Sequence, residues 1–399
     1  MKILLLLEAT LGGTGRHILD LSDGLLALDH EVHLVYSLVR ADHAFLSGLA
    51  ALRKKEPRFH CESTAIRRSV GISDIRSYLE LARYVAREGP FDILHAHSTK
   101  AGFLLRLLIS RRGAAMVYTP HGLMTLNHEL RGPSRWAVSV LESCLARISD
   151  AVIAVSGVER QCAIDTGIPA EKLTVIHNGL NFAHAPDMER RDTVRARLGL
   201  EAGTVCVASI GLLVANKEPG RLLDAFAIVA GKTTQPVCLL VIGWGPLEAD
   251  LRARAAALGI VDHVRFLGQV SGIEYLPAVD ILAHTSRYEG FGYVFLETLS
   301  AGIPVITTRV GGADELIESG VTGYICDPWN SEEFAAFLLR FIDSPEQRAA
   351  AAVPARARAE RSSATVMVSA TAGVYQSIRQ PQKASVNALK DRLISRNPQ

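Results

Sequence analysis

The chain has 399 residues, of which 48% are hydrophobic and 21% are charged. This length is enough for two domains with full cores, and the composition excludes disordered and fibrous proteins. There are 43 lysine and arginine residues against 41 aspartate and glutamate residues, so the formal net charge is +2. A balance this close to neutral argues against broad nucleic-acid binding, and any basic surface must be local.

The first seven residues superficially resemble a signal peptide, but this apolar run is too short for one and ends at Glu8. We therefore interpret it as a strand. No stretch approaches the roughly 20 apolar residues that a membrane-spanning helix needs. The six cysteines lie far apart without a Cys-x-x-Cys spacing, which favours reduced core cysteines in a cytoplasmic protein.

Short apolar segments alternate with helical patterns in the first half of the chain, which is typical of a parallel sheet built from βαβ units. A helix is expected over about residues 15–28. The predicted strands cover residues 3–7, 32–36, 93–96, 116–119, 151–155 and 173–176. Polar or small residues form four of the strand tips, at residues 95–98, 120–122, 156–157 and 177–179. Ligands of open α/β sheets bind at the carboxyl ends of strands, so we expect these tips and the Gly12-Gly13 loop to line one cleft.

A charged segment over residues 182–200 separates two sets of strands and is the predicted interdomain linker. The second set of strands is expected at residues 205–210, 237–242, 264–267, 281–283, 304–307 and 323–326. The fold class is therefore α/β, with two Rossmann-like, doubly wound domains facing a central cleft. We assign the domains to residues 1–183 and 200–365, followed by a C-terminal helix and a loose tail over residues 366–399.

The stretch 284–312 carries two acidic residues that stand out, Glu289 and Glu297. Glu289 lies in a turn flanked by two glycines, which should open a helix over about residues 293–301. Glu297 is the only carboxylate of that helix, whose other side chains are mostly apolar, so the helix should be buried. A carboxylate there needs a basic partner or a ligand with hydroxyl groups, such as the vicinal diol of a ribose. The alternative is a solvent-facing Glu297, with Glu289 complementing the helix dipole.

Glu289 and Glu297, with Phe291 and Gly292 between them, resemble the Glu-x7-Glu motif of glycosyltransferase family 4, group 1 type. These are retaining enzymes of the GT-B fold, and the resemblance covers nearly the whole chain. It implies that Glu289 contacts hydroxyl groups of the donor sugar and that Glu297 holds the ribose of the nucleotide. It also implies an acceptor-side N-terminal domain and a C-terminal domain that binds the nucleotide sugar.

The loop from Ile210 to Lys217 resembles the family's Gly-Arg-Leu segment, in which a lysine follows five residues after the arginine. By this resemblance the Lys217 ammonium neutralises the pyrophosphate as it leaves. Leu212 takes the place of the arginine and supplies no phosphate contact, so Arg16 or Arg309 would have to compensate. The alternative for Lys217 is a solvated loop lysine.

Gly12-Gly13 resembles the family's N-terminal glycine loop, which lets backbone N–H groups approach the donor phosphates at the start of a helix. The same glycines could indicate a nicotinamide site, but Ile18 in the third glycine position argues against it. His121 follows a strand between a proline and a glycine, and similar enzymes place this histidine beside the donor sugar. The alternative for His121 is a packing residue.

His95, His97 and His177 occupy similar strand tips, but they come from more than one strand without the spacing of metal ligands, and no Asp-x-Asp occurs. We therefore expect no metal and no cofactor besides the donor substrate. The basic residues from Arg53 to Arg76, interspersed with apolar residues, are predicted to form one patch. Similar enzymes use such a patch to contact an anionic membrane, and the alternative is a solvated surface.

The sequence thus predicts a metal-independent retaining glycosyltransferase of the hexosyltransferase type, cytoplasmic and peripheral to the inner face of the plasma membrane. It would move a sugar from a nucleotide diphosphate sugar to a glycan or lipid-linked acceptor in bacterial-type surface polysaccharide synthesis. His121 and Glu289 are the candidate catalytic residues, and no nucleic acid is expected as a partner. Two alternatives remain, a sugar-nucleotide 2-epimerase on the same fold and a catalytically silent nucleotide-sugar-binding protein.

Overall fold

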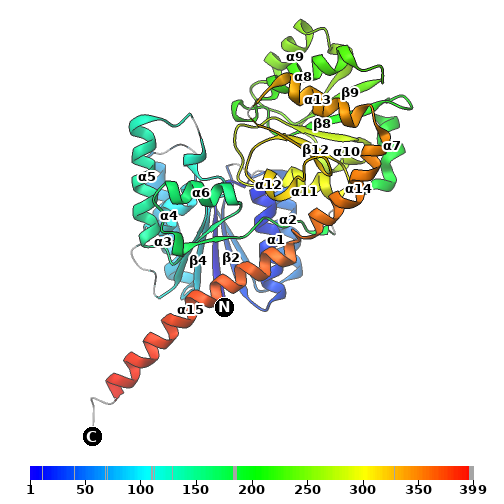
Figure 1. Cartoon of the computed structure of the whole chain (residues 1–399). Coiled ribbons are helices and arrows are strands. Elements are labelled where there is room, and N and C mark those ends of the chain that lie inside the picture. Colours follow the sequence, from blue (N-terminus) through cyan, green and yellow to red (C-terminus); the bar gives the residue numbers. More distant parts are fainter. Residues whose placement is uncertain are drawn as a thin grey trace. The chain divides into compact units, whose positions relative to one another are not determined.

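The computed structural model describes residues 1–394 except residues 11, 40, 68, 70, 109–110, 112, 128, 183–186 and 328. It contains two compact units (Figure 1). The first comprises Met1–Asn178 together with the chain from Ala364, and the second comprises Gly179–Ser363. Each unit holds one parallel sheet with helices around it, so the predicted class of two doubly wound α/β domains is confirmed.

The sheet of the first unit has seven strands in the order β3-β2-β1-β4-β5-β6-β7, all parallel. The strands are β1 (Lys2–Leu7), β2 (Glu31–Ser37), β3 (Phe59–Thr64), β4 (Ile93–His97), β5 (Ala115–Thr119), β6 (Ala151–Ala154) and β7 (Leu173–Val175). The central strand β1 is a run of buried aliphatic residues, as expected for a strand covered on both faces. Edge strand β3 was not predicted, because its sequence is mostly polar and only Phe59 is buried.

Seven helices belong to the described part of the first unit. They are α1 (Gly13–Ala27), α2 (His43–Lys55), α3 (Ser73–Glu88), α4 (Thr99–Arg106), α5 (Gly132–Arg147), α6 (Gly157–Asp165) and α15 (Ala364–Ile394), with 3-10 turns η1 (Met124–Leu126) and η2 (Ala170–Lys172). The last helix packs on the first: a Cβ at Gly24 would lie 2.5 Å from a methyl group of Val368. Tyr375 is also fully buried there. Hence α15, predicted as a separate segment with a loose tail, completes the core of the first unit.

The sheet of the second unit has six parallel strands in the order β10-β9-β8-β11-β12-β13. The strands are β8 (Val205–Ile210), β9 (Val237–Ile242), β10 (Val264–Gly268), β11 (Ile281–His284), β12 (Val305–Thr308) and β13 (Gly323–Cys326), all six at the predicted places. The helices are α7 (Arg191–Arg197), α8 (Pro219–Lys232), α9 (Glu248–Ala257), α10 (Gly272–Tyr275), α11 (Tyr293–Ser300), α12 (Ala313–Leu316), α13 (Ser331–Ile342) and α14 (Pro345–Glu360). Short 3-10 turns are η4 (Met188–Arg190), η5 (Ala215–Lys217), η6 (Val261–His263) and η7 (Leu276–Ala278).

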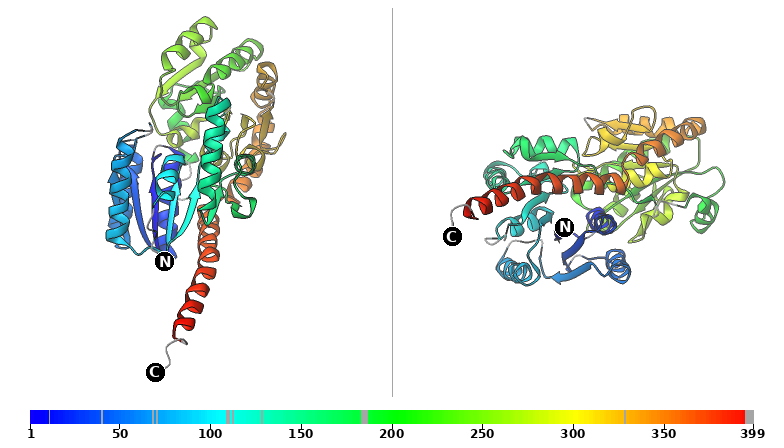
Figure 2. Two further views of the ribbon diagram at one scale, coloured as in Figure 1. Left: turned by 90° about the vertical axis from the view of Figure 1, so that its left-hand side faces the viewer. Right: turned by 90° about the horizontal axis from the view of Figure 1, so that it is seen from below.

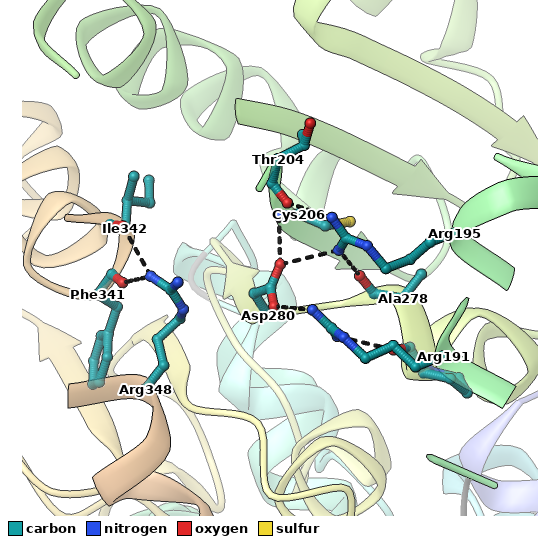
Figure 3. Close-up of polar contacts among 10 residues, drawn as sticks. Arg191, Arg195, Thr204, Cys206, Ala278, Asp280, Phe341, Ile342 and Arg348 are labelled. Carbon is teal, nitrogen blue, oxygen red and sulfur yellow. Dashed lines mark hydrogen bonds and ion pairs between the residues drawn. The ribbon is translucent and has the colours of Figure 1, made fainter. Parts of the chain in front are cut away.

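Part of the predicted linker is an integral element of the second unit. In α7, Arg191 and Arg195 both reach the carboxylate of Asp280, at 2.6 and 3.4 Å (Figure 3). The same carboxylate accepts the backbone N–H of Cys206 at 2.8 Å. Because Asp280 precedes β11 and Cys206 lies on β8, these contacts fasten α7 to two central strands. The units divide between Asn178 and Gly179, whereas the predicted boundary at residue 183 lies outside the described residues.

The basic residues predicted as one patch form two groups. Arg53, Lys54 and Lys55 end α2 and precede β3, whereas Arg67 and Arg76 follow that strand. Strand β3 lies between the two groups in the chain, while the charge of Arg53 acts on Cys61 within β3 and on Tyr36 of β2. A single patch stays a prediction. Arg68 of the same prediction lies outside the described residues.

Two further predictions concern membranes and cysteines. Among the described residues, the structure contains no helix with the length and apolar character required to cross a bilayer.

All six cysteines are free thiols, and Cys206, Cys238 and Cys326 are buried as expected. Cys144 is exposed on α5, so the prediction of a core position is wrong for this residue.

Candidate functional site

Four histidines gather at the carboxyl ends of the central strands of the first unit. His95 and His97 lie on β4, His121 follows β5, and His17 lies on α1. The Nδ1 atom of His97 is 3.0 Å from Nε2 of His121, and the rings of His17 and His121 are 4.4 Å apart between centroids. The predicted convergence of the tips of β4 and β5 with the start of the first helix is therefore confirmed. His177 follows β7, two strands away from β5.

Burial sets the protonation state of this cluster. It lowers the pKa of His17 to about 4, although a hydrogen bond with Asn178 acts in the other direction. It also holds the pKa values of His95, His97 and His121 well below their usual value, and repulsion between the rings adds to this effect. All four imidazoles are thus neutral near pH 7 and can each donate and accept a hydrogen bond.

Neutral imidazoles are also metal ligands. His17, His97 and His121 each offer one ring nitrogen, and these atoms lie within 4.8 Å of one another. Three histidines with an open position are a common zinc ligand set. Glu31, His33 and His60 form a second such group at the edge of the sheet. The expected absence of a metal stays a prediction.

His121 has an unusual backbone conformation, with φ at +56°, which costs a non-glycine residue energy unless its surroundings fix it. The fixing group is the buried carboxylate of Glu159 on α6. Its Oε1 accepts the N–H groups of Gly122 and Leu123 at 2.5 and 2.9 Å, and its Oε2 accepts that of Val155 at 2.8 Å. Burial raises the pKa of Glu159, and the three backbone hydrogen bonds partly offset this rise. Glu159 therefore holds the loop that presents His121.

The sequence reasoning missed Glu159, although it contains a signal for it. Ser156 and Glu159 have the Ser-x-x-Glu spacing of a capping box at the start of a helix. The Ser156 hydroxyl does accept the N–H of Glu159 at 3.1 Å. The glutamate side chain, however, turns to the loop after β5, and no sequence pattern states which strand will lie beside it.

The predicted glycine loop lies at the start of α1. Gly12 is the N-cap residue with φ at +73°, and Gly13 begins the helix. A Cβ at Gly15 would lie 2.1 Å from the carbonyl oxygen of Thr10, so only glycine permits this close turn. The first turn of α1 carries no acidic residue and no side-chain cap, an arrangement that favours an anion at the helix start.

In the second unit, Glu289 lies at the centre of a partly buried polar group. It forms an ion pair with Lys217 and accepts a hydrogen bond from Nε2 of His284 at 3.0 Å. Burial alone would raise the pKa of Glu289, but the lysine and the histidine outweigh it and hold this pKa far below its usual range. Glu289 is therefore ionised at any physiological pH. The structure thus brings together two predicted residues, Lys217 and Glu289, with His284, which the sequence reasoning did not assign.

Further contacts join the loop that carries Lys217 to the segment after β11. The hydroxyl of Thr285 donates to the carbonyl oxygens of Lys217 and Glu218 at 3.1 and 3.0 Å. The guanidinium of Arg287 pairs with the Glu218 carboxylate. The backbone N–H of Arg287 donates to the carbonyl oxygen of Asn216 at 2.8 Å. The backbone around the ion pair is thereby fixed before any ligand is present.

The turn after Glu289 is shaped by close backbone contacts. Gly292 has φ at +78° and caps α11, and Phe291 is buried beside it. A Cβ at Gly312 would lie 2.0 Å from the carbonyl oxygen of Phe291, and one at Gly311 would lie 2.3 Å from that of Gly290. The glycines after β12 therefore let two loops pack backbone to backbone.

Helix α11 confirms the predicted buried helix over residues 293–301. Phe295, Leu296 and Leu299 are fully buried, whereas Glu297 is half-buried. Glu297 is thus partly exposed on a helix whose apolar side chains are mostly buried. This position suits an acceptor for ligand hydroxyls, and the predicted ribose contact stays a prediction.

Leu212 belongs to a backbone segment that extends β8. The N–H groups of Gly211 and Leu213 donate to the carbonyl oxygens of Ile242 and Trp244, both at 2.9 Å. Leu213 is buried in the core. Because successive side chains of an extended segment point to opposite sides, the side chain of Leu212 points away from this core. Of the two arginines predicted to compensate, Arg309 pairs with Asp314 and Asp327. The Nε atom of Arg16 lies 3.8 Å from Oδ2 of Asp20, and both residues are on α1.

Comparisons with known proteins identify the chain. Residues 11–184 match the family described as Glycosyltransferase Family 4, and residues 190–358 match Glycosyl transferases group 1. The chain belongs to the family 4, group 1 glycosyltransferases. Among similar proteins, D-inositol 3-phosphate glycosyltransferase of Streptomyces scabiei is 28% identical over 306 residues, 72% of this chain and 68% of that protein. Glycogen synthase of Mycobacterium tuberculosis is 28% identical over 403 residues, 93% of this chain and 94% of that protein.

Solved structures of similar fold include Anabaena Alr3699/HepE, with a TM-score of 0.78 and 24% identity over 94% of this chain and 100% of that one. Sucrose-phosphate synthase from Thermosynechococcus elongatus has a TM-score of 0.79 and 18% identity, covering 95% and 99% of the two chains. At these identities the likeness shows the fold, which is GT-B. This family 4 glycosyltransferase therefore has the fold class predicted from its sequence.

Replacement of Glu159 by glutamine tests how His121 is held in this glycosyltransferase. An amide has only one accepting oxygen, so at least one of the three backbone N–H groups loses its acceptor. We expect the free energy of unfolding to fall by about 1–3 kcal/mol. Displacement of His121 should lower kcat by about ten- to a hundred-fold in protein that is still folded. Thermal melts and steady-state kinetics measure the two effects.

Gln161→Ala, an exposed change two residues away, is the matched control and should alter neither quantity. A folded Glu159→Gln protein with unchanged kcat would contradict the positioning role of Glu159.

Proposed function

We propose that this protein is a retaining glycosyltransferase that moves a sugar from a nucleotide diphosphate sugar to a glycan or lipid-linked acceptor. The observation that carries this proposal is the partly buried Lys217–Glu289–His284 group beside the glycine-shaped turn that opens α11. It offers a cation for a diphosphate and a fixed carboxylate for sugar hydroxyls. Solved proteins of this fold support it, since Anabaena Alr3699/HepE has been crystallised with UDP and with UDP-glucose.

The residues would act by position and charge. The Lys217 ammonium is partly exposed, so a bound diphosphate can share it with Glu289. Glu289, kept ionised by Lys217 and His284, accepts hydrogen bonds from the donor sugar, and Glu297 accepts those of the ribose. As the sugar–phosphate bond breaks, Lys217 stabilises the growing phosphate charge, and that phosphate takes the proton of the acceptor hydroxyl. The sugar then keeps its configuration through same-face substitution.

The first unit would supply the reaction centre with His121 and the start of α1. A neutral His121 can accept a hydrogen bond from a sugar hydroxyl or donate one to its oxygen, and Glu159 fixes its direction. The N–H groups at Gly12 and Gly13 would face the donor phosphates. We assign the acceptor site to this unit.

We further propose that the enzyme works in bacterial-type surface polysaccharide synthesis, in the cytoplasm and peripheral to the inner face of the plasma membrane. Enzymes of this fold support this setting, among them the lipopolysaccharide outer core galactosyltransferase WaaB. Of the region Arg53 to Arg76, the part after β3 is the better membrane contact, because Ile72 and Ile75 are 87% and 62% exposed beside Arg76.

Incubation with a panel of nucleotide diphosphate sugars and a membrane lipid extract tests the proposal. Mass spectrometry should find an acceptor heavier by one sugar residue, and NMR should show the anomeric configuration of the donor. Conversion of the donor without any acceptor would instead identify a 2-epimerase. If the protein binds donors but converts none of them, it is a catalytically silent nucleotide-sugar-binding protein.

Substitutions of the two glutamates should have different effects on binding. Glu297→Ala removes an ionised acceptor from the ribose, so we expect affinity for the free nucleoside diphosphate to fall by about 1.5–3 kcal/mol, roughly ten- to a hundred-fold. Glu289→Ala should lower turnover and sugar selectivity while diphosphate affinity stays nearly intact. Titration calorimetry with the diphosphate measures both. Glu332→Ala, an exposed change, is the control, and unchanged affinity in Glu297→Ala would overturn the ribose assignment.

Chelation should leave sugar transfer intact, because Lys217, backbone amides and helix starts are proposed to stabilise the leaving diphosphate. Activity is to be measured after extended dialysis against EDTA, with metal content followed by mass spectrometry. Loss of activity that Mg²⁺ or Mn²⁺ restores would overturn this assignment. Loss that only Zn²⁺ restores would point to His17, His97 and His121 instead, and their alanine variants would then fail to retain zinc.

A further inference from the structure

A second polar cluster of the first unit lies at the amino ends of its edge strands. It consists of Glu31 and His33 on β2 and of His60 on β3. The strands are parallel, so their amino ends lie together, at the end of the sheet where Figure 2 (left) marks the N-terminus. The histidines of the candidate site gather at the carboxyl ends instead. The cluster is therefore a feature separate from that site.

The register of the two strands brings the three side chains to one face of the sheet. Glu31 and His33 are two positions apart on β2, and strand side chains at this spacing point the same way. His60 is the direct partner of His33 in the parallel pairing of β2 with β3. The two imidazole rings accordingly lie 4.5 Å apart between centroids. The cluster is thus built into the sheet by its strand pairing.

The polar atoms of the cluster have separations close to those of metal ligands. Oε1 of Glu31 is 2.9 Å from Nε2 of His33 and 3.9 Å from Nε2 of His60. Each of the three residues offers one ligand atom within 4.8 Å of the others. Zinc binds nitrogen and carboxylate oxygen at about 2.0–2.2 Å, so the ligand atoms of a tetrahedral site are about 3.3–3.5 Å apart. Shifts of about 0.5 Å would bring both printed separations into this range.

Neighbouring groups fix the ring of His33 in the way that metal-binding histidines are fixed. Its Nδ1 atom lies 2.8 Å from the hydroxyl of Tyr84 on α3, and Phe91 packs edge-on against the ring. A ring that donates from Nδ1 to this hydroxyl leaves the lone pair of Nε2 for a metal. Burial lowers the pKa of His33, although the contact with Glu31 acts in the other direction, so the ring is neutral near pH 7.

The cluster is open to solvent on its other side. The side chains of Glu31 and His60 are 38% and 48% exposed, whereas that of His33 is 2% exposed. An ion can therefore enter from solvent and keep a water molecule in the fourth ligand position. The ammonium of Lys2 competes with such an ion, because its Nζ lies 3.0 Å from the same Oε1 of Glu31. Binding should therefore be reversible.

We propose that Glu31, His33 and His60 form a binding site for a divalent transition-metal ion, with Zn²⁺ the best match to two imidazoles and one carboxylate. The ion would link β3, an edge strand that buries only Phe59, to β2. This structural role goes beyond the proposed function and holds whichever donor and acceptor the enzyme uses. The expectation of no metal rests on ligand spacing along the chain, which cannot reveal ligands that meet across two strands.

Zinc titration of the untagged full chain, after treatment with EDTA and dialysis, tests the proposal. Competition with a chromogenic chelator should show zinc binding, and added zinc should slow amide hydrogen exchange at residues 59–64. His60→Ala removes a half-exposed ligand, so it should lower the affinity at least about tenfold and abolish this slowing. Tyr84→Phe keeps the ring but not the hydroxyl and should weaken binding about ten- to a hundred-fold. Lys2→Met, which removes the competing ammonium, should bind zinc more tightly.

The matched control is His43→Ala, which removes an exposed histidine of the same unit outside the cluster and should bind zinc like the unchanged protein. Failure of the full chain to bind zinc would overturn the proposal, as would unchanged affinity and exchange in His60→Ala. Slowed exchange only around His17, His97 and His121 would place the ion at that group instead. Matching circular dichroism spectra without zinc show that each variant is folded. Because no activity is read, failure here is distinct from failure of the proposed function.

Discussion

The ion pair between Lys217 and Glu289 joins two loops of the second unit that the chain places more than 70 residues apart. A partly buried lysine and glutamate each lose some hydration, and their mutual contact, with that of His284, compensates for it. The pairing fixes the loop after β8 against the segment after β11, and Thr285 and Glu218 continue the contact. The glycine-lined turn and the start of α11 follow from the position of Glu289.

In the first unit, the single carboxylate of Glu159 fixes the loops around the candidate site. The carboxylate of Glu159 is surrounded by three backbone N–H groups. These groups belong to two loops at the carboxyl edge of the sheet, so the charge fixes backbone there. In both units an acidic side chain thus fixes the surroundings of a histidine, through backbone N–H groups at Glu159 and through side chains at Glu289. Rigid loops of this kind suit an enzyme whose rate depends on the placement of its substrates.

Much of this architecture could be predicted from the sequence, because buried parallel strands are continuous apolar runs and the second sheet follows that rule in all six strands. Glu289, Lys217 and His121 could be found because glycine, proline and strand ends surround them. Strand β3 was not predicted, because an edge strand buries few side chains. Glu159 was missed, because the loop that it contacts lies more than 30 residues away in the chain.

The return of α15 to the first unit has a consequence for how the chain is made. The core around β1 includes four residues of α15, namely Met367, Val368, Ala372 and Tyr375. The hydroxyl of Tyr375 lies 2.6 Å from Nδ1 of His95. During synthesis these residues leave the ribosome after the whole second unit. The N-terminal unit must therefore wait, with part of its core uncovered and the histidine cluster lacking one wall, until α15 has been made. A chain cut at residue 178 would leave its first part without this closing segment and its second part with the segment but without the core that it covers.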